Sequence, residues 1–150
     1  MMSMNTINLL LFKVNTGSAE EYYAIDVDKV YEIRVVEKIT AIPDSRIITG
    51  IMNLRGKIIS VVDINDLLGF DYKDDVSKRK ILIVSVNNTT LGLIVDDVEQ
   101  VAKITDENID YNAAILDNIP YIKGIIKMNE RLVIYIDIDR LFNNGGMLQQ

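Results

Sequence analysis

The second half of the chain repeats the residue pattern of the first half, and this repeat constrains the fold more than any other feature. When Gly50 is aligned with Gly124, an offset of 74, the next eighteen positions match in type without a gap. Upstream, residues 24–30 align with residues 92–98 at an offset of 68. Each half is therefore predicted to contain a hairpin, a strand, a second hairpin and a short helix, with an insertion in the second half around residues 108–118.

The apolar residues favour strands over helices. The chain has 24 Ile and 14 Val but 6 Ala, and branching at Cβ suits a pleated strand better than a helix. Short apolar runs bounded by turn residues predict ten strands, at residues 7–14, 22–27, 30–39, 49–54, 57–63, 80–86, 90–95, 98–104, 121–128 and 131–138. Short helices are expected near residues 64–68 and 138–143, because each follows a capping aspartate, Asp63 or Asp137.

Five strands per half is the number that closes a small barrel without exposed edges. We therefore expect an all-β fold of two five-stranded barrels, related by internal duplication. Barrels of this size would be marginal alone and should pack together as one domain, residues 1–150. The expected boundaries are about 7–72 for the first subdomain and about 78–143 for the second, followed by a flexible C-terminal tail, 144–150.

The chain contains no His and no Cys, which excludes a Ser-His-Asp triad, a cysteine nucleophile and imidazole or thiolate metal sites. Neither a GxGxxG nor a GxxxxGK[ST] pattern is present, so nucleotide binding has no support. Carboxylates do gather near residues 26–28 and 96–99. Aspartate is also common in tight turns. We expect no enzymatic activity, no cofactor and no metal. The alternative is a β-barrel enzyme that uses the carboxylates of these Asp-rich turns for catalysis.

The net charge of −6 opposes binding to phosphate backbones, so no nucleic acid is expected as a partner. No apolar stretch approaches the roughly 20 residues that a membrane span needs, and the N-terminus lacks the basic residues of a signal peptide. We expect a cytoplasmic protein with no direct membrane insertion.

Surface recognition is the remaining class of function. Arg55 lies in the predicted turn at residues 53–56, where a guanidinium is either simply solvated or able to fork onto a partner's carboxylate or carbonyl oxygens. Glu32 is expected on the outward face of its strand, where it could pair with Arg55. Apolar residues between the two barrels would form a groove suited to a partner's helix.

Several strings resemble the CheW-like family of bacterial chemotaxis coupling proteins. They are Glu32-Ile33-Arg34, Ile42-Pro43, Gly50-Ile51-Met52-Asn53-Leu54-Arg55-Gly56 with the strand that follows to Asp63, and the segments 92–98 and 132–137. The resemblance extends over residues 9–142, and the Gly-x-x-Asn-Leu-Arg-Gly string is its most specific part. It implies two five-stranded SH3-like barrels, in agreement with the repeat.

The resemblance also implies an adaptor without catalytic activity. Its partners would be the cytoplasmic tips of methyl-accepting chemoreceptors and the regulatory domain of the histidine kinase CheA, which would place it at membrane receptor arrays. The receptor-binding positions that the resemblance implies are Val30, Glu32, Asn53, Leu54, Arg55, Gly56, Val98 and Val101. The implied kinase-binding positions are Arg79, Lys80 and Ile81, two of which are basic where some relatives are apolar or polar.

Two alternatives remain within this family. The chain could be a free-standing relative of the kinase's own regulatory domain, or the coupling module of a CheV-type protein. A start methionine and a Gly-Gly and Gln-Gln ending favour a free-standing coupling protein.

Overall fold

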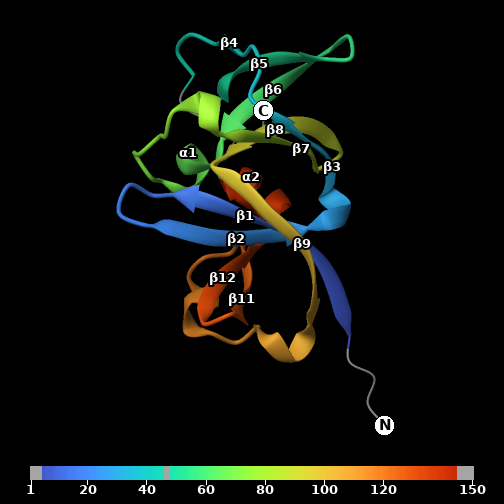
Figure 1. Cartoon of the computed structure of the whole chain (residues 1–150), viewed down its shortest axis with the longest axis vertical. Helices are drawn as coiled ribbons and strands as arrows, with labels where there is room; N and C mark the ends of the chain where they lie inside the picture. The colour runs from blue at the N-terminus through green and yellow to red at the C-terminus, as the bar shows by residue number, and fades with distance from the viewer. Residues whose placement is uncertain (1–4, 46–47, 145–150) are drawn as a thin grey trace.

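Two curled β-sheets make up most of the computed structural model, which describes residues 5–45 and 48–144 (Figure 1). The upper sheet in Figure 1 contains β3 (Val30–Val35), β4 (Thr40–Ala41), β5 (Ile48–Leu54), β6 (Lys57–Asp63), β7 (Lys80–Val86) and β8 (Thr89–Val95). The lower sheet contains β1 (Thr6–Asn15), β2 (Glu20–Asp26), β9 (Asp97–Thr105), β10 (Ile109–Asp110), β11 (Ile122–Met128) and β12 (Arg131–Ile136).

The helices of the described residues are short. Two α-helices, α1 (Ile64–Leu68) and α2 (Ile138–Asn144), follow β6 and β12 as predicted. The described residues also form four 3₁₀ turns: η1 (Val27–Lys29), η2 (Val76–Lys78), η3 (Asp106–Asn108) and η4 (Ala114–Asp117). None of the described helices has the length and apolar character that crossing a membrane would need. The expected flexible tail falls on residues 144–150, of which only Asn144, the last residue of α2, lies within the described residues.

The expected fold class, two SH3-like barrels in an all-β chain, is confirmed. Each sheet has six strands rather than five, because β4 and β10 are additional strands of two residues each. The predicted strand at residues 30–39 accordingly ends at Val35, and β4 begins after a short link. A two-residue strand carries no periodic pattern, so β4 and β10 could not be predicted from apolar periodicity.

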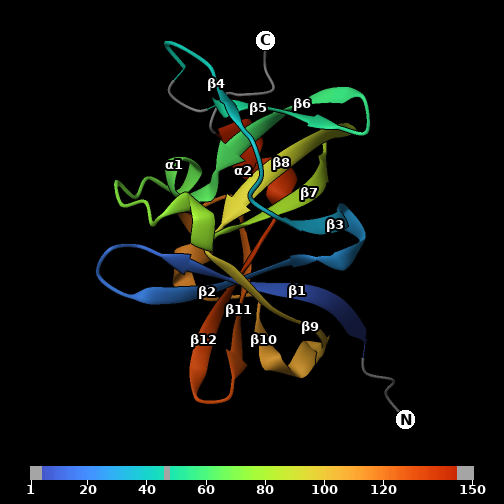
Figure 2. The same cartoon turned by 45° about the horizontal axis from the view of Figure 1, so that its top comes forward.

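The sheets do not follow the expected subdomain boundaries of 7–72 and 78–143. The lower sheet joins β1 and β2 to β9–β12, and the upper sheet joins β3–β6 to β7 and β8. The chain therefore crosses between sheets at η1 and again between β8 and β9, as the change of level in Figures 1 and 2 shows. Apolar periodicity marks where strands lie but not which strands pair. The exchange of strands between the two halves of the chain was therefore not predicted.

The repeat is present in the topology despite this exchange. The order β10-β11-β12-β2-β1-β9 of one sheet becomes the order of the other when every strand is shifted by six places. The parallel pair β6·β8 places Val61 opposite Gly92, and the parallel pair β12·β2 places Tyr135 opposite Ala24. These pairs are related by the offsets of 74 and 68 found in the sequence.

Glycine is required at Gly50 and Gly124, which are equivalent in the repeat. A Cβ atom at Gly50 would lie 2.4 Å from the backbone oxygen of Thr40 in β4, and one at Gly124 would lie 2.7 Å from Cγ2 of Ile109 in β10. Each glycine also lies at a register shift of its hairpin. The absence of a side chain therefore lets each two-residue edge strand lie close to the strand it pairs with, β4 beside β5 and β10 beside β11.

The apolar core has three parts. Leu9 and Leu11 of β1 point into the lower sheet, whereas Leu10 and Phe12 point into a cluster that lies between the sheets. In β7, the equivalent strand of the upper sheet, residues alternate in the same way: Ile81 and Ile83 inward, Leu82 and Val84 toward the other sheet. Both strands are buried on both faces, which explains their continuous apolar runs.

Candidate docking site

The β5–β6 hairpin carries Arg55 at its tip. Arg55 and Gly56 have φ angles of 50° and 86°, the left-handed pair that a two-residue hairpin turn of the primed type needs. The side-chain oxygen of Asn53 accepts a hydrogen bond from the backbone N–H of Gly56 at 2.8 Å. Asn53 and Gly56 therefore shape the turn, and Arg55 is the residue that the turn presents.

Arg55 forms an ion pair with Glu32 of β3. The distance from Arg55 Nη2 to Glu32 Oε2 is 2.6 Å, and the side chains are 73% and 25% exposed, respectively. Arg34 Nε lies 3.9 Å from the other carboxylate oxygen of Glu32. A pair this exposed contributes only about 0–1 kcal/mol to stability. Its main effect is to hold a largely exposed guanidinium in a defined position.

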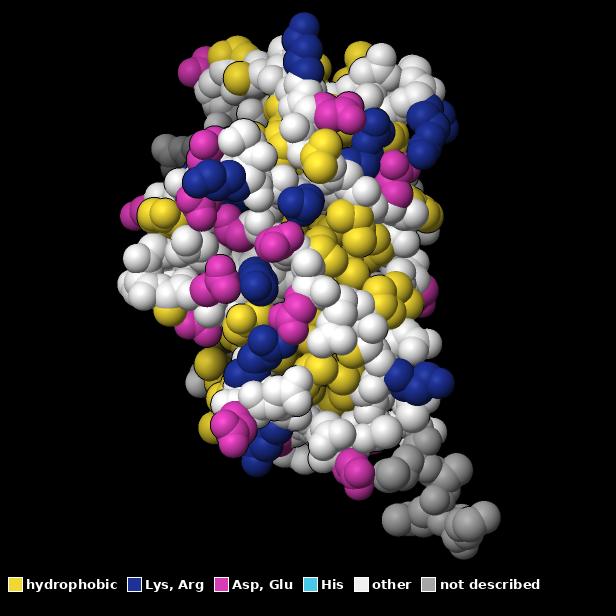
Figure 3. Space-filling model, in the orientation of Figure 1, with side chains coloured by type: hydrophobic (Ala, Val, Ile, Leu, Met, Phe, Trp, Pro, Cys, Tyr) yellow, Lys and Arg dark blue, Asp and Glu magenta, His cyan; other side chains and the backbone are white. Residues whose placement is uncertain are grey.

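A cleft of about 270 Å³ adjoins this ion pair. Its walls combine apolar side chains with the charged groups at the rim, and they are Tyr31, Glu32, Leu54, Arg55, Lys57, Ile59, Ile83 and Thr90. Figure 3 shows apolar side chains gathered over the part of this face that holds β3 and β9. The structure thus brings together Glu32, Leu54 and Arg55 of the predicted receptor-binding residues.

The outward face of β3 is apolar rather than charged. Tyr31, Ile33 and Val35 are exposed, whereas Glu32 is half-buried. This reverses the expectation that Glu32 lies on the outward face. The pairing of β3 with β7 shifts register between Val30 and Glu32, and a one-residue shift exchanges the faces of a strand. Tyr31 was not predicted as a site residue, although it borders Glu32 in the sequence.

Asn53 and Gly56 form the turn beside Arg55, whereas the other three predicted receptor-binding residues, Val30, Val98 and Val101, do not line the cleft. Val30 and Val98 are half-buried and pack against the cluster between the sheets. Val101 is exposed on β9, the edge strand of the lower sheet. Of these three, only Val101 presents a largely accessible side chain.

Two of the three predicted kinase-binding residues are buried. Arg79 is 1% exposed and Ile81 is fully buried, and Lys80 is half-buried with its amino group 3.8 Å from Asp97. The side chains of Arg79 and Ile81 therefore have almost no surface for direct contact with a partner, whereas Lys80 remains partly accessible. The basic run at residues 78–80 had the pattern of a surface segment, but β7 begins immediately at Lys80.

Arg79 holds the junction between the sheets. Its two terminal nitrogens contact the carboxylate of Asp63 at 2.5 and 2.9 Å, and its Nε lies 3.0 Å from Asp96. The other oxygen of Asp96 accepts a hydrogen bond from the backbone N–H of Asn15 in β1. Burial acts to lower the pKa of Arg79, but the hydrogen bond and charge of Asp63 outweigh it and raise the pKa, so the guanidinium stays charged.

The equivalent hairpin of the lower sheet has different charges. In the β11–β12 turn, Asn129 and Glu130 take the left-handed positions of Arg55 and Gly56. Arg131 contacts Glu99 and stacks 3.7 Å from the ring centre of Tyr22, so its guanidinium is held against the sheet. The Arg-bearing tip is therefore specific to the β5–β6 hairpin.

The Asp-rich turns are engaged in internal contacts. Asp26 accepts a hydrogen bond from the hydroxyl of Tyr135 at 2.7 Å and lies 3.3 Å from the amino group of Lys123, and Asp96 is held by Arg79 and Asn15. Across residues 5–45 and 48–144, no three acidic side chains are grouped as a metal ion would need.

Two curled sheets, with a charged hairpin tip beside a partly apolar cleft, place the chain in the class of small β-barrel modules. Within that class the chain belongs to the CheW-like domain family, whose model matches residues 8–145. It is 31% identical over 140 residues to the chemotaxis protein CheW of Thermotoga maritima, which covers 93% of this chain and 89% of that protein. It is 27% identical over 138 residues to CheW of Bacillus subtilis, over 90% and 86% of the two chains.

A solved structure agrees with this assignment. The scaffolding protein TtCheW from Thermoanaerobacter tengcongensis superposes with a TM-score of 0.79 and 32% identity, over 92% of this chain and 93% of that one. The predicted resemblance to the family of chemotaxis coupling proteins is confirmed.

Proposed function

We propose that the protein is a non-enzymatic adaptor that couples methyl-accepting chemoreceptors to the histidine kinase CheA. The observation that carries the proposal is the Arg55–Glu32 pair beside the apolar cleft, in a chain of the CheW-like family. The protein would act in the cytoplasm, at receptor arrays, through these two partners.

The cleft suits an apolar side chain from a receptor's helical hairpin. Tyr31 offers most of the exposed apolar surface, because Ile59 lies buried in the wall of the cleft, and Arg55 at the rim keeps donor groups available beyond the one that meets Glu32. Charges at the rim of an interface mainly set orientation and association rate. We therefore assign anchoring to the apolar wall and orientation of the receptor to Arg55.

Kinase contact would involve the surface around Lys80 rather than Arg79 and Ile81. Because Arg79 fixes Asp63 and Asp96 at the junction of the sheets, a change at Arg79 would alter kinase binding only through the shape of that surface. A loss of kinase binding in an Arg79 variant is thus expected to accompany a loss of stability.

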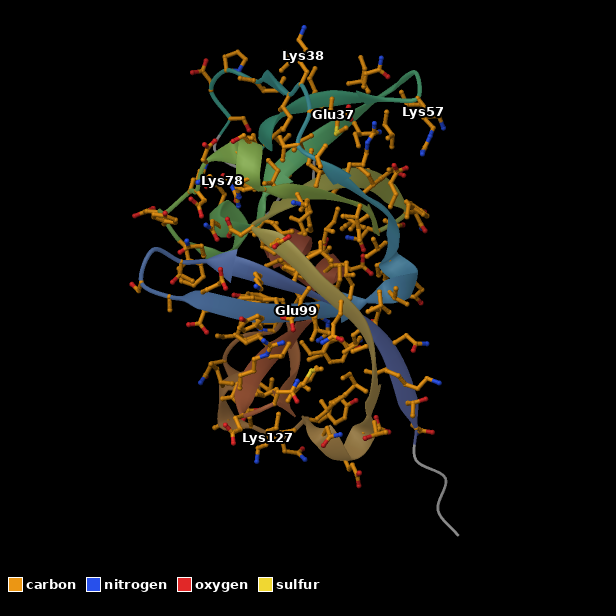
Figure 4. All side chains as sticks on the ribbon, viewed as in Figure 1. Glu37, Lys38, Lys57, Lys78, Glu99 and Lys127 are labelled. Carbon is orange, nitrogen blue, oxygen red and sulfur yellow. The ribbon has the colours of Figure 1, made fainter. Side chains whose placement is uncertain are left out.

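The receptor contact is tested by Arg55→Glu, titrated against a cytoplasmic receptor fragment. We expect an affinity at least about tenfold weaker, because the variant places a like charge beside Glu32 and removes the donors, with an unchanged circular dichroism spectrum. Lys127→Glu is the matched control: Lys127 is an exposed lysine on β11 at the opposite end of the molecule from the β5–β6 hairpin (Figure 4).

Equal affinities of Arg55→Glu and the unchanged protein would remove Arg55 from the receptor site. Equal weakening by Arg55→Glu and Lys127→Glu would indicate a net-charge effect rather than a local contact. Co-elution of the protein with both a receptor fragment and the kinase regulatory domain tests the adaptor role itself, and three separate peaks at micromolar concentration would contradict it.

A further inference from the structure

The exchange of strands makes each half of the chain incomplete without the other. The first half, residues 5–74, supplies two strands to the lower sheet and four to the upper sheet. The second half, residues 75–144, supplies four to the lower sheet and two to the upper sheet. Neither half contains all the strands of either sheet.

Four strand pairs join the two halves. They are the antiparallel pairs β1·β9 and β3·β7 and the parallel pairs β2·β12 and β6·β8. The longest, β1·β9, runs from Thr6 opposite Thr105 to Lys13 opposite Asp97. Separating the halves would expose an unpaired edge on every one of these strands, and buried backbone groups that lose their partners are costly.

The core between the sheets is also shared. Phe12 and Tyr23 come from the first half, and Leu82 and Phe142 come from the second. All four are buried in one cluster, so neither half can bury its own apolar face alone. The strand seams and this cluster form one continuous interface.

Buried charge adds specificity to that interface. Asp63 belongs to the first half and Arg79 to the second, and their contact is almost fully buried. A second contact runs from Asp96 of the second half to the backbone of Asn15 in the first. A buried guanidinium that loses its carboxylate is strongly unfavourable, so correct pairing of the halves is favoured over other associations.

The covalent link between the halves contributes little to this interface. The residues between Gly69 and Arg79 are mostly exposed, and Lys73 pairs with Asp66 within the first half. We propose that the two halves are a reciprocal binding pair, each the obligate folding partner of the other, held by the four strand seams and the Asp63–Arg79 contact and not by the linker.

The test is to cut the folded chain. A recognition sequence for a site-specific protease is inserted between Asp74 and Asp75 of the full-length protein, which is purified intact and then cleaved. We expect the halves to elute together at the size of the uncut protein with its circular dichroism spectrum. The urea midpoint of the cleaved protein should rise with protein concentration, because unfolding then releases two chains.

Two variants of the cleavable chain test the buried contact. Asp63→Asn removes the carboxylate that crosses between the halves, and we expect at least a tenfold larger dissociation constant after cleavage. Asp66→Asn is the control, since Asp66 pairs with Lys73 of its own half, and it should leave the dissociation constant within about twofold.

Three results would overturn the proposal. The halves could separate after cleavage while each keeps its own cooperative transition, which would make them independent domains. They could lose structure on cleavage, which would make the linker essential. The urea midpoint of the cleaved protein without substitutions could be independent of concentration, a result that does not depend on whether Asp63→Asn folds.

Discussion

Arg79 and Arg55 show how the environment decides the role of the same side chain. Arg55 is exposed, and its pairing with Glu32 contributes little to stability, so the guanidinium remains available to a partner. Arg79 is buried between two carboxylates and has no surface to offer. One arginine is suited to recognition and the other to holding the sheets together.

Arg79→Ala should therefore destabilise the fold. The variant leaves Asp63 buried without its cation, and breaking a buried pair in this way costs about 3–5 kcal/mol. The free energy of unfolding from urea titration measures the loss. Lys78→Ala, at an exposed neighbouring position, should change it by less than about 0.5 kcal/mol. Similar losses in both variants would contradict the structural role of Arg79.

Local patterns explain only part of the predicted site. A turn exposes its central residue, so Arg55 and an outward-facing Glu32 were expected to be able to pair, whereas their assignment as receptor-binding residues came from the resemblance to the CheW-like family. Arg79 was mistaken for a surface residue because its carboxylate partners, Asp63 and Asp96, lie 16 and 17 positions away in the sequence. Sequence spacing alone does not indicate that these three residues meet.

At the scale of elements, strand positions followed from apolar periodicity, but strand pairing did not. The runs that became β1 and β7 were visible as apolar segments, and their burial on both faces follows from their central place in the fold. The links η1 and Asp96, where the chain changes sheet, lie in the two acidic turns of the sequence, but an acidic turn does not indicate which sheet the next strand joins. Pairing is decided by contacts between strands far apart in the chain, which local patterns do not encode.

The close pairing of β4 with β5 at Gly50 gives a prediction at the level of this element. Gly50→Ala would place a Cβ 2.4 Å from the Thr40 backbone oxygen, and we expect destabilisation of about 1–3 kcal/mol from the forced shift of β4. Gly124→Ala should cost less, because its nearest neighbour is the side chain of Ile109. Chemical denaturation of both variants checks the order, and the reverse order would contradict it.

At the scale of the whole molecule, a buried tyrosine links stability to alkaline pH. Burial between the sheets raises the pKa of Tyr23 to about 12 from an ordinary value of 10. Because the folded pKa is the higher one, this stability is fully present below pH 10 and is lost as pH rises from 10 through 12. A shift of two units corresponds to about 3 kcal/mol.

Urea titrations at pH 9 and pH 11.5 measure this loss. Tyr23→Phe keeps the ring beside Phe12 and removes the hydroxyl, so its stability should fall less between the two pH values. Burial and the hydrogen bond to Asp26 also raise the pKa of Tyr135, so part of the alkaline loss should persist in the variant. An identical loss in both proteins would exclude Tyr23 as a source.

The shared core between the sheets has a mechanical consequence. Because β1 and β7 are buried on both faces and four strand seams cross from one half to the other, turning one sheet on the other would disrupt the packing of both strands. A pull on the β5–β6 hairpin would reach the far end of the molecule as a tilt of the whole body. A partner bound at that end would then meet the same surface in a different orientation. The internal shape of the protein would not change.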